Sequence, residues 1–163
     1  MIKETFRINE SEKYKLDVYI QDESPEITLS HLRPFVLVCP GGSYVMTSDR
    51  EADPIAFAYL ADGFHVGVLR YSVGEDASYP NPNVDLSVAL RMIRENAKRW
   101  HIDPDKIAIC GFSAGGHLVA RQGVHWNDPE IARLSGCENG ENRPNALILG
   151  YPLITSGQYA HRE

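Results

Sequence analysis

The stretch from Lys106 to Ala120 reads KIAICGFSAGGHLVA, and it decides the fold prediction. Its first part, Ile107 to Cys110, is an unbroken apolar run of the kind found in strands that are covered on both faces. The segment from His117 to Trp126 can continue as a helix. Between the two lies GFSAG, in which glycines flank a serine. The stretch therefore predicts a strand that turns abruptly into a helix.

The central residues, Gly111 to Gly115, match the G-x-S-x-G pattern of a nucleophile elbow, in which the serine is pushed out above the sheet. The serine takes a strained backbone conformation there, and both glycines must be small because strand and helix pass close together. The five letters alone are weak evidence, since a glycine- and serine-rich turn of another α/β protein would also match. The flanking strand and helix favour the elbow, with Ser113 as its exposed hydroxyl.

The composition indicates one globular domain without a nucleic-acid or membrane partner. The chain has 163 residues, 43% of them apolar, and a net charge of -6 with no cluster of Lys and Arg. The amino terminus is polar and lacks the apolar core of a signal peptide, and no apolar run reaches membrane-spanning length. We expect a cytoplasmic protein.

The cysteines suggest neither a disulfide framework nor a zinc site. Cys39, Cys110 and Cys137 are an odd number and lack C-x-x-C spacing. Cys39 and Cys110 each end an apolar run, which is typical of buried thiols, and a chance thiol pair is open if the two are neighbours. We expect no metal and no cofactor.

The amino-terminal half alternates strand and helix patterns. Two alternating segments predict an antiparallel hairpin at a sheet edge, a β-branched apolar run predicts a buried strand, and Pro54 marks the start of a helix. The predicted strands are Ile2 to Ile8, Lys15 to Ile20, a short one at Glu26 to Leu29, Pro34 to Cys39 and His65 to Leu69. The predicted helix is Ile55 to Ala61, preceded by Asp53 and with Pro54 at its first position.

A long helix with an apolar stripe is predicted before the elbow strand. Asn83 is a suitable N-cap, and the stripe continues to Trp100. Asp85 is interpreted as charge in the first turn of this helix rather than as a catalytic acid. The sequence Asp103-Pro104-Asp105 predicts a turn, with the two aspartates as turn and cap residues.

After the elbow helix, the polar segment from Asn127 to Pro144 is expected to be irregular, and Ala146 to Leu149 to be one more buried strand. The alternation of strands and helices predicts an α/β fold, with a mainly parallel sheet and helices on both faces. We find no internal repeat and no linker, so residues 1–163 are expected to form a single domain.

Two predicted strands end in glycine turns, Pro40-Gly41-Gly42-Ser43-Tyr44 and the elbow itself. The carboxyl ends of parallel strands meet at the edge of the sheet where binding sites form. A serine that attacks an acyl carbonyl creates an oxyanion, and each backbone N–H aimed at that oxygen lowers the barrier by roughly 3 to 4 kcal/mol. The two turns together indicate acyl-transfer chemistry.

With these two motifs the chain resembles the α/β-hydrolase family, in the branch of carboxylesterases and acetyl or sugar-ester esterases related to hormone-sensitive lipase. The resemblance implies that Ser113 is the nucleophile and that the N–H groups of Gly42, Ser43 and Ala114 form the oxyanion hole. Pro40 and Ser43 depart from the family's H-G-G-G segment, a form associated with enzymes that act on acetylated sugars.

In this family the catalytic acid and then the histidine follow the serine, on loops after later strands. Only thirteen residues follow Gly150, among them His161 and Glu163, which leaves no room for those strands. We therefore expect the carboxyl-terminal strands to be missing. His117, one helical turn after Ser113, is interpreted as a structural or surface residue.

The remaining histidines, His31, His65, His101 and His125, have no partner acid at a diagnostic spacing, and no pair of carboxylates stands out for glycosidase chemistry. Tyr44, Tyr71 and Tyr79 fall near the carboxyl edge of the sheet, where they either line a substrate pocket or pack under the loops.

Two hypotheses follow. The first is a serine carboxylesterase that hydrolyses small acyl esters, acetylated sugars among them, through an acyl-enzyme on Ser113. The second is a truncated or non-catalytic hydrolase fragment that acts as a binding module. Its open sheet edge would also allow homo-oligomers.

Overall fold

The computed structural model describes residues 1–24, 26 and 32–158. Its centre is a six-stranded sheet with the strand order β1-β2-β4-β3-β5-β6. The strands are β1 (Ile2–Arg7), β2 (Lys15–Ile20), β3 (Arg33–Cys39), β4 (His65–Arg70), β5 (Ile102–Phe112) and β6 (Ala146–Gly150). The helices are α1 (Asp53–Ala61), α2 (Asn81–Glu95), α3 (Ala114–His125) and α4 (Pro129–Ser135), with short 3-10 turns η1 (Asp49–Glu51) and η2 (Gly74–Asp76).

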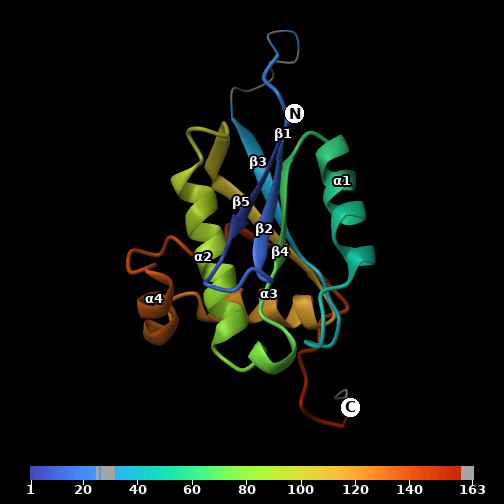
Figure 1. Cartoon of the computed structure of the whole chain (residues 1–163), viewed down its shortest axis with the longest axis vertical. Helices are drawn as coiled ribbons and strands as arrows, with labels where there is room; N and C mark the ends of the chain where they lie inside the picture. The colour runs from blue at the N-terminus through green and yellow to red at the C-terminus, as the bar shows by residue number, and fades with distance from the viewer. Residues whose placement is uncertain (25, 27–31, 159–163) are drawn as a thin grey trace.

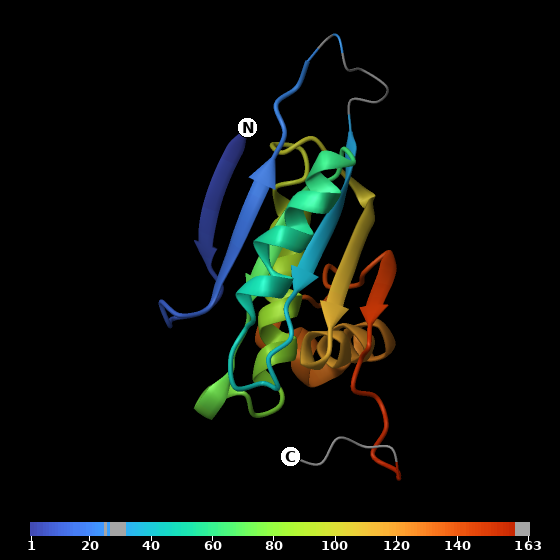
Figure 2. The same ribbon diagram turned by 90° about the vertical axis from the view of Figure 1, so that its right-hand side faces the viewer.

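The sheet is mainly parallel, as predicted. Strands β4, β3, β5 and β6 run in one direction, and the hairpin β1–β2 pairs antiparallel to β4. Figure 2 shows β1 and β6 at opposite edges of the sheet, with the arrowheads of β3, β5 and β6 pointing toward α3. The predicted short strand at Glu26 to Leu29 lies outside the described residues, except for Glu26.

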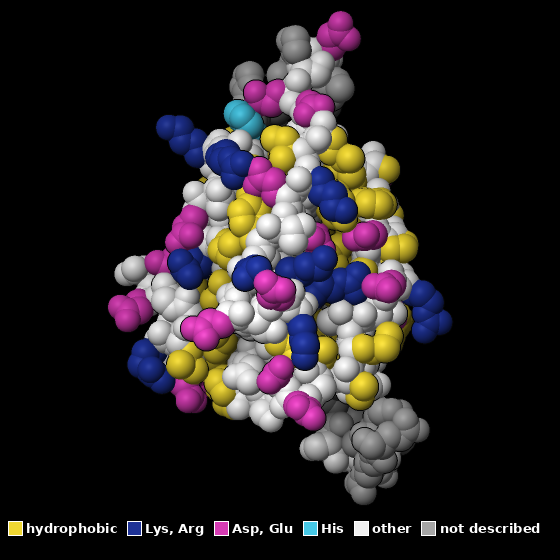
Figure 3. Space-filling model, in the orientation of Figure 1, with side chains coloured by type: hydrophobic (Ala, Val, Ile, Leu, Met, Phe, Trp, Pro, Cys, Tyr) yellow, Lys and Arg dark blue, Asp and Glu magenta, His cyan; other side chains and the backbone are white. Residues whose placement is uncertain are grey.

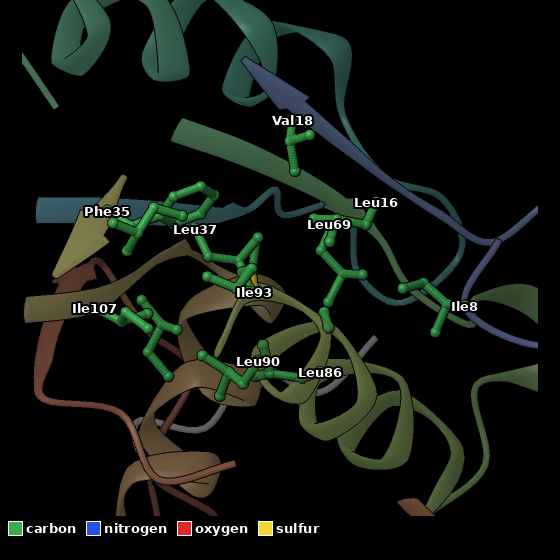
Figure 4. Packing of buried hydrophobic residues seen from close by; sticks show 14 of the residues in the cluster. Ile8, Leu16, Val18, Phe35, Leu37, Leu69, Leu86, Leu90, Ile93 and Ile107 are labelled. Atoms are coloured by element: carbon green, nitrogen blue, oxygen red, sulfur yellow. The ribbon is translucent and has the colours of Figure 1, made fainter. Parts of the chain in front are cut away.

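Helices cover both faces of the sheet (Figure 1). One face packs against α2 and α3 through a cluster that includes Leu37, Leu90 and Ile109. Figure 4 shows apolar side chains of the strands and of α2 pointing toward one another in this cluster. The other face packs against α1 through a smaller cluster that includes Val38 and Val68. Because β3 is buried on both faces, its side chains alternate between the two clusters.

The thiols of Cys39 and Cys110 belong to these two clusters, on opposite faces of the sheet. Both are buried and free, as is Cys137. Their adjacent positions at the ends of β3 and β5 therefore do not make a thiol pair.

The long helix starts earlier than predicted. Helix α2 begins at Asn81, after the N-cap residue Pro80, so Asn83 lies inside the helix and is buried. Proline at the helix start needs no N–H partner, and Pro82 fits the first turn for the same reason. The helix ends at Glu95, and Trp100 is buried beyond it, in a turn where its N–H donates to the Asn96 carbonyl at 2.9 Å.

The Asp-Pro turn before the elbow strand proved to be part of that strand. Strand β5 starts at Ile102, with a register shift against β3 between Arg33 and Phe35. Asp103 accepts the N–H of Asp105 at 3.0 Å, a turn-like bond within this irregular stretch.

The segment predicted to be irregular contains helix α4. The Asp128 carboxylate caps it by accepting the N–H groups of Glu130 and Ile131, and Gly136 ends it in the left-handed conformation with φ 69°. An Asp-Pro start and a glycine stop are ordinary helix signals, so this helix could have been found in the sequence.

Strand β6 forms where predicted, but it is not buried. Leu147 and Leu149 are 39% and 40% exposed. The strand pairs with β5 on one side, and no described strand lies on its other side. The prediction of a buried strand was wrong because apolar sequence does not reveal whether a neighbour covers it.

The charges on the surface are mixed in sign. On the face that Figure 3 shows, Lys and Arg side chains are interspersed with Asp and Glu. Within the described residues, no helix combines the length and the apolar character that crossing a membrane requires.

The elbow region depends on glycines that allow three backbone segments to touch. A Cβ at Gly111 would collide with the carbonyl of Gly115, and a Cβ at Gly115 would collide with the Cys39 carbonyl and lie 2.6 Å from the Pro40 oxygen. The ends of β3 and β5 and the start of α3 therefore pack backbone to backbone, as the pattern G-x-S-x-G predicts.

We expect Gly115→Ala to destabilise the protein by about 3 kcal/mol or more, because the methyl group meets fixed backbone atoms. Gly123→Ala in the same helix is the matched control. Its methyl group meets only the end of the exposed Leu147 side chain, and alanine favours the helix, so the change should stay within about 1 kcal/mol of wild type. Urea unfolding followed by circular dichroism measures both. Equal unfolding free energies for the two variants would contradict the role of Gly115.

Candidate active site

Ser113 stands between β5 and α3 in a backbone conformation that few residues adopt, with φ 51° and ψ -117°. Such a conformation costs of order 1–3 kcal/mol and persists only where the surroundings impose it. Here the Ser113 N–H donates to the Gly150 carbonyl at 3.0 Å, and the Ser113 carbonyl accepts the N–H of His117 at 2.9 Å. The elbow is thus held both by β6 and by the first turn of α3.

The glycine turn after β3 lies directly beside this serine. A Cβ at Gly41 would be 3.1 Å from the Ser113 Cβ. Gly42, Ser43 and Tyr44 all have positive φ angles, of 135°, 55° and 58°, so the backbone turns sharply here. The Gly41 carbonyl accepts the N–H of Ser48 at 2.8 Å, which closes the turn.

The N–H groups of Gly42, Ser43 and Ala114 have no hydrogen-bond acceptor among the described residues. Two of them come from the glycine turn and the third from the first residue of α3. Helix N-termini and successive turn amides are common places for a developing negative charge to bind. The three residues that the sequence suggested are therefore brought to the edge of the sheet where Ser113 lies.

Glu51, which sequence reasoning missed, supports the glycine turn. Its Oε2 accepts the Gly41 N–H at 2.7 Å, and its Oε1 accepts the Tyr151 hydroxyl at 2.8 Å. The Tyr151 ring in turn lies 5.7 Å from that of Phe112, centroid to centroid. Glu51 therefore ties the glycine turn to the end of β6. Nothing in the local sequence distinguishes it from Asp49.

His117 contacts Tyr44. The Tyr44 hydroxyl lies 2.8 Å from His117 Nδ1, and the two rings meet edge to face. Burial lowers the pKa of His117, and the positive charge of Arg121 lowers it further. Among the described residues, no hydrogen bond links the Ser113 hydroxyl to a histidine or a carboxylate.

The other histidines have structural surroundings. His65 is buried, accepts the Gln21 N–H at 3.2 Å, and has its pKa lowered to about 4 by burial. His101 Nδ1 lies 2.7 Å from Glu23 Oε1, and His125 is exposed at the end of α3. His31, His161 and Glu163 lie outside the described residues.

The sequence prediction placed Asp85 in the wrong turn of helix α2. It is not in the first turn of α2 but lies buried one turn further on. Its carboxylate accepts the Ser72 N–H at 2.7 Å, the Ser72 hydroxyl, and the Asn9 side-chain amide at 3.0 Å. Burial raises the pKa of this carboxyl, and the hydrogen bonds oppose the shift. Asp85 thereby joins the start of the β4–α2 segment to α2 and to the β1–β2 hairpin.

Of the three tyrosines, Tyr71 packs under the glycine turn, and Tyr44 and Tyr79 line a cavity. Tyr71 is fully buried, and its hydroxyl donates to the Pro40 carbonyl at 2.6 Å beneath the glycine turn. Tyr44 and Tyr79 line one cavity of about 230 Å³. Within the described residues, no group of three or more His, Cys, Asp or Glu side chains is arranged to hold a metal ion.

Known proteins are similar to this chain in sequence and in structure. The chain is 39% identical over 139 residues to endo-1,4-beta-xylanase B of Butyrivibrio fibrisolvens, covering 80% of this chain and 21% of that protein. It is 33% identical over 117 residues to an acetylxylan esterase of Xylanibacter ruminicola, covering 71% of this chain and 22% of that protein. Among solved structures, the alpha/beta hydrolase MGS-M1 from a Medee basin deep-sea metagenome library superposes with a TM-score of 0.82 at 43% identity.

That superposition covers 100% of this chain and 62% of MGS-M1, so the chain spans less than two thirds of these relatives. The BD-FAE family profile matches residues 16–149, which include both glycine turns. The chain therefore belongs to the BD-FAE family of α/β-hydrolases, in the carboxylesterase and acetylxylan esterase branch.

Proposed function

We propose that this chain carries the nucleophile and the oxyanion hole of a serine carboxylesterase that acts on small acyl esters, acetylated sugars among them. The observation that carries the proposal is the strained conformation of Ser113 beside a glycine turn with free N–H groups. Membership in an esterase family and similarity to a protein named acetylxylan esterase support it.

In the proposed reaction, the Ser113 oxygen bonds to the acyl carbon while its proton passes to a general base. The carbonyl oxygen becomes an oxyanion, which accepts hydrogen bonds from the N–H groups of Gly42, Ser43 and Ala114. The intermediate then expels the alcohol, which takes the proton, and water later hydrolyses the acyl-serine.

No described histidine is placed to serve as that base. We propose that the base and its partner acid come from polypeptide that follows β6 in the longer relatives, of which this chain covers 62% in the case of MGS-M1. Loss of the base and acid removes most of the catalysis in serine hydrolases, because only the oxyanion hole and substrate binding remain.

The 163-residue chain should therefore hydrolyse p-nitrophenyl acetate with a kcat at least about 10⁴-fold below that of complete carboxylesterases. A fluorophosphonate should still label it slowly, and intact mass should show one adduct that Ser113→Ala loses and Ser156→Ala, at an exposed serine, retains. Turnover of 1 s⁻¹ or faster, in the range of roughly 1–10³ s⁻¹ typical of enzymes, and lost in Ser113→Ala, would refute the absence of a base. A fluorophosphonate adduct on the Ser113→Ala variant would refute the assignment of Ser113 as the nucleophile.

The exposed edge of the sheet favours the second function, a module that associates through β6. Val124, Leu147, Leu149 and Ile154 form an apolar surface here, which we call the β6 patch, and each is at least 39% exposed. Val124 and Ile154 line the same hollow, and Leu147 packs on Gly123 beside Val124. An unpaired edge strand with apolar neighbours invites pairing with another chain.

We expect the mass of the wild-type chain, measured by light scattering after size-exclusion chromatography, to rise with protein concentration. Leu149→Lys should bring it to the monomer value, because a charge on an edge strand opposes pairing. Leu134→Lys, at a leucine of α4 that is 45% exposed, should leave the association unchanged. A wild-type mass that stays at the monomer value at every concentration would contradict association through the β6 patch.

A further inference from the structure

The cavity lined by Tyr44 and Tyr79 lies between α3 and the segment that joins β4 to α2, and two of its residues are close in sequence to the proposed site. Tyr44 follows directly after Ser43, and His117 stands one helical turn after Ser113. Asn83 and Arg121 complete the polar part of the wall. At about 230 Å³ the cavity is small for a ligand pocket, which limits its occupant to a single sugar or a group of similar size.

Arg121 is the unusual member of this wall. Its guanidinium has no hydrogen bond and no ion pair to any described residue, and its Nε is buried without a partner. Its recorded contact is the ring of Tyr79, whose centroid lies 4.3 Å from Cζ. The other partly buried arginines, Arg33, Arg70, Arg91 and Arg94, each donate to a carbonyl or a carboxylate.

A second donor in the same wall also lacks a partner. Asn83 is only 4% exposed, and its side-chain Nδ2 makes no hydrogen bond in the described structure. Both of these atoms are closed off from solvent, so a ligand in the cavity would meet the outer nitrogens of Arg121 rather than Asn83 Nδ2 or Arg121 Nε.

The acceptors nearby are already engaged. The Tyr79 hydroxyl donates to Asp128 at 3.1 Å, and the same carboxylate caps α4. The charge of Arg121 acts on this carboxylate, but within the described residues no ion pair or hydrogen bond joins the two side chains. His117 Nδ1 is occupied by the Tyr44 hydroxyl. None of the described residues that line the cavity carries a negative charge, and a bound carboxylate would supply one. Arginine binds a carboxylate through two parallel hydrogen bonds, and stacking on Tyr79 keeps the guanidinium plane fixed.

We propose that this cavity binds a carboxylate carried by the substrate, as in an ester of a sugar acid, with the outer nitrogens of Arg121 as its donors. The inference rests on the proposed esterase function and specifies its substrate class. The enzyme would then favour acyl esters of acidic sugars over esters of neutral sugars of the same size.

The test measures binding without catalysis. Amide resonances of the ¹⁵N-labelled chain are followed by NMR during titration with sodium D-glucuronate and, separately, with neutral D-glucose at the same ionic strength. D-glucuronate should cause saturable shifts around Asn83 and Arg121, with D-glucose at least about 10-fold weaker. Arg121→Gln should weaken D-glucuronate binding by about 10-fold or more, the usual effect of losing a charged hydrogen-bond partner. Arg133→Gln removes the same charge from an exposed position on α4 and should change nothing.

Equal affinity for D-glucose, unchanged binding to Arg121→Gln, or no saturable shift with D-glucuronate would each overturn the proposal. Tighter binding of N-acetylglutamate amide than of D-glucuronate would show that the carboxylate comes from a polypeptide, which also overturns a substrate site. Fluorophosphonate labelling of Ser113 separates the two claims. Labelling without D-glucuronate binding leaves the esterase proposal standing and refutes the substrate class, whereas D-glucuronate binding without labelling refutes an ester substrate.

Discussion

The packing of backbone against backbone at the elbow is the constraint on which the rest of the structure depends. The ends of β3 and β5 and the first turn of α3 meet where Gly41, Gly111 and Gly115 leave no room for a side chain. This contact forces Ser113 into its strained conformation and places the glycine turn beside it. The apolar clusters on both faces of the sheet supply the stability that maintains the strain.

Around this point the chain arranges groups that stabilise charge rather than groups that move protons. Within the described residues, the N–H groups of the two turns have no acceptor and the Arg121 guanidinium has no ion pair, so these groups offer hydrogen-bond donors and positive charge to the same edge of the sheet. Glu51 and Tyr71 hold the glycine turn from outside and from below. The described part of the chain therefore places hydrogen-bond donors beside Ser113, and the proposed ester hydrolysis needs a general base from outside these residues.

The parts of the fold that local sequence determines could be predicted. A proline at the first turn predicts helix α1, and a run of β-branched residues predicts strand β3. A serine flanked by glycines predicts the elbow. Each of these signals lies within a few consecutive residues. The exposure of β6 and the beginning of α2 could not be predicted in this way. The exposure of a strand depends on which neighbouring strand is present. At the start of α2, Asn83 is the residue that cap preferences favour, whereas the N-cap in the folded chain is Pro80, which makes no side-chain capping hydrogen bond.

The site was predictable to the same extent. Ser113, Gly42, Ser43 and Ala114 could be named because motifs carry them, and the structure brings all four to one edge of the sheet. Glu51, Asp85 and Arg121 could not be identified as they are, because their importance depends on partners far away in the chain. Asp85, for example, differs from an ordinary helix aspartate only through its bonds to Ser72 and Asn9.

The bond from the Ser113 N–H to the Gly150 carbonyl has a kinetic consequence. It joins the most strained residue of the elbow to β6, the least covered strand of the parallel part of the sheet. Edge strands fray through local openings that cost much less than global unfolding. The Ser113 amide should therefore exchange its hydrogen with solvent when β6 opens, together with the β5 amides that bond to β6, whereas the β5 amides that bond to β3 exchange only when the core unfolds. In this protein the order of the Ser113 backbone is set by the edge of the sheet, and anything that pairs with β6 makes the elbow more rigid.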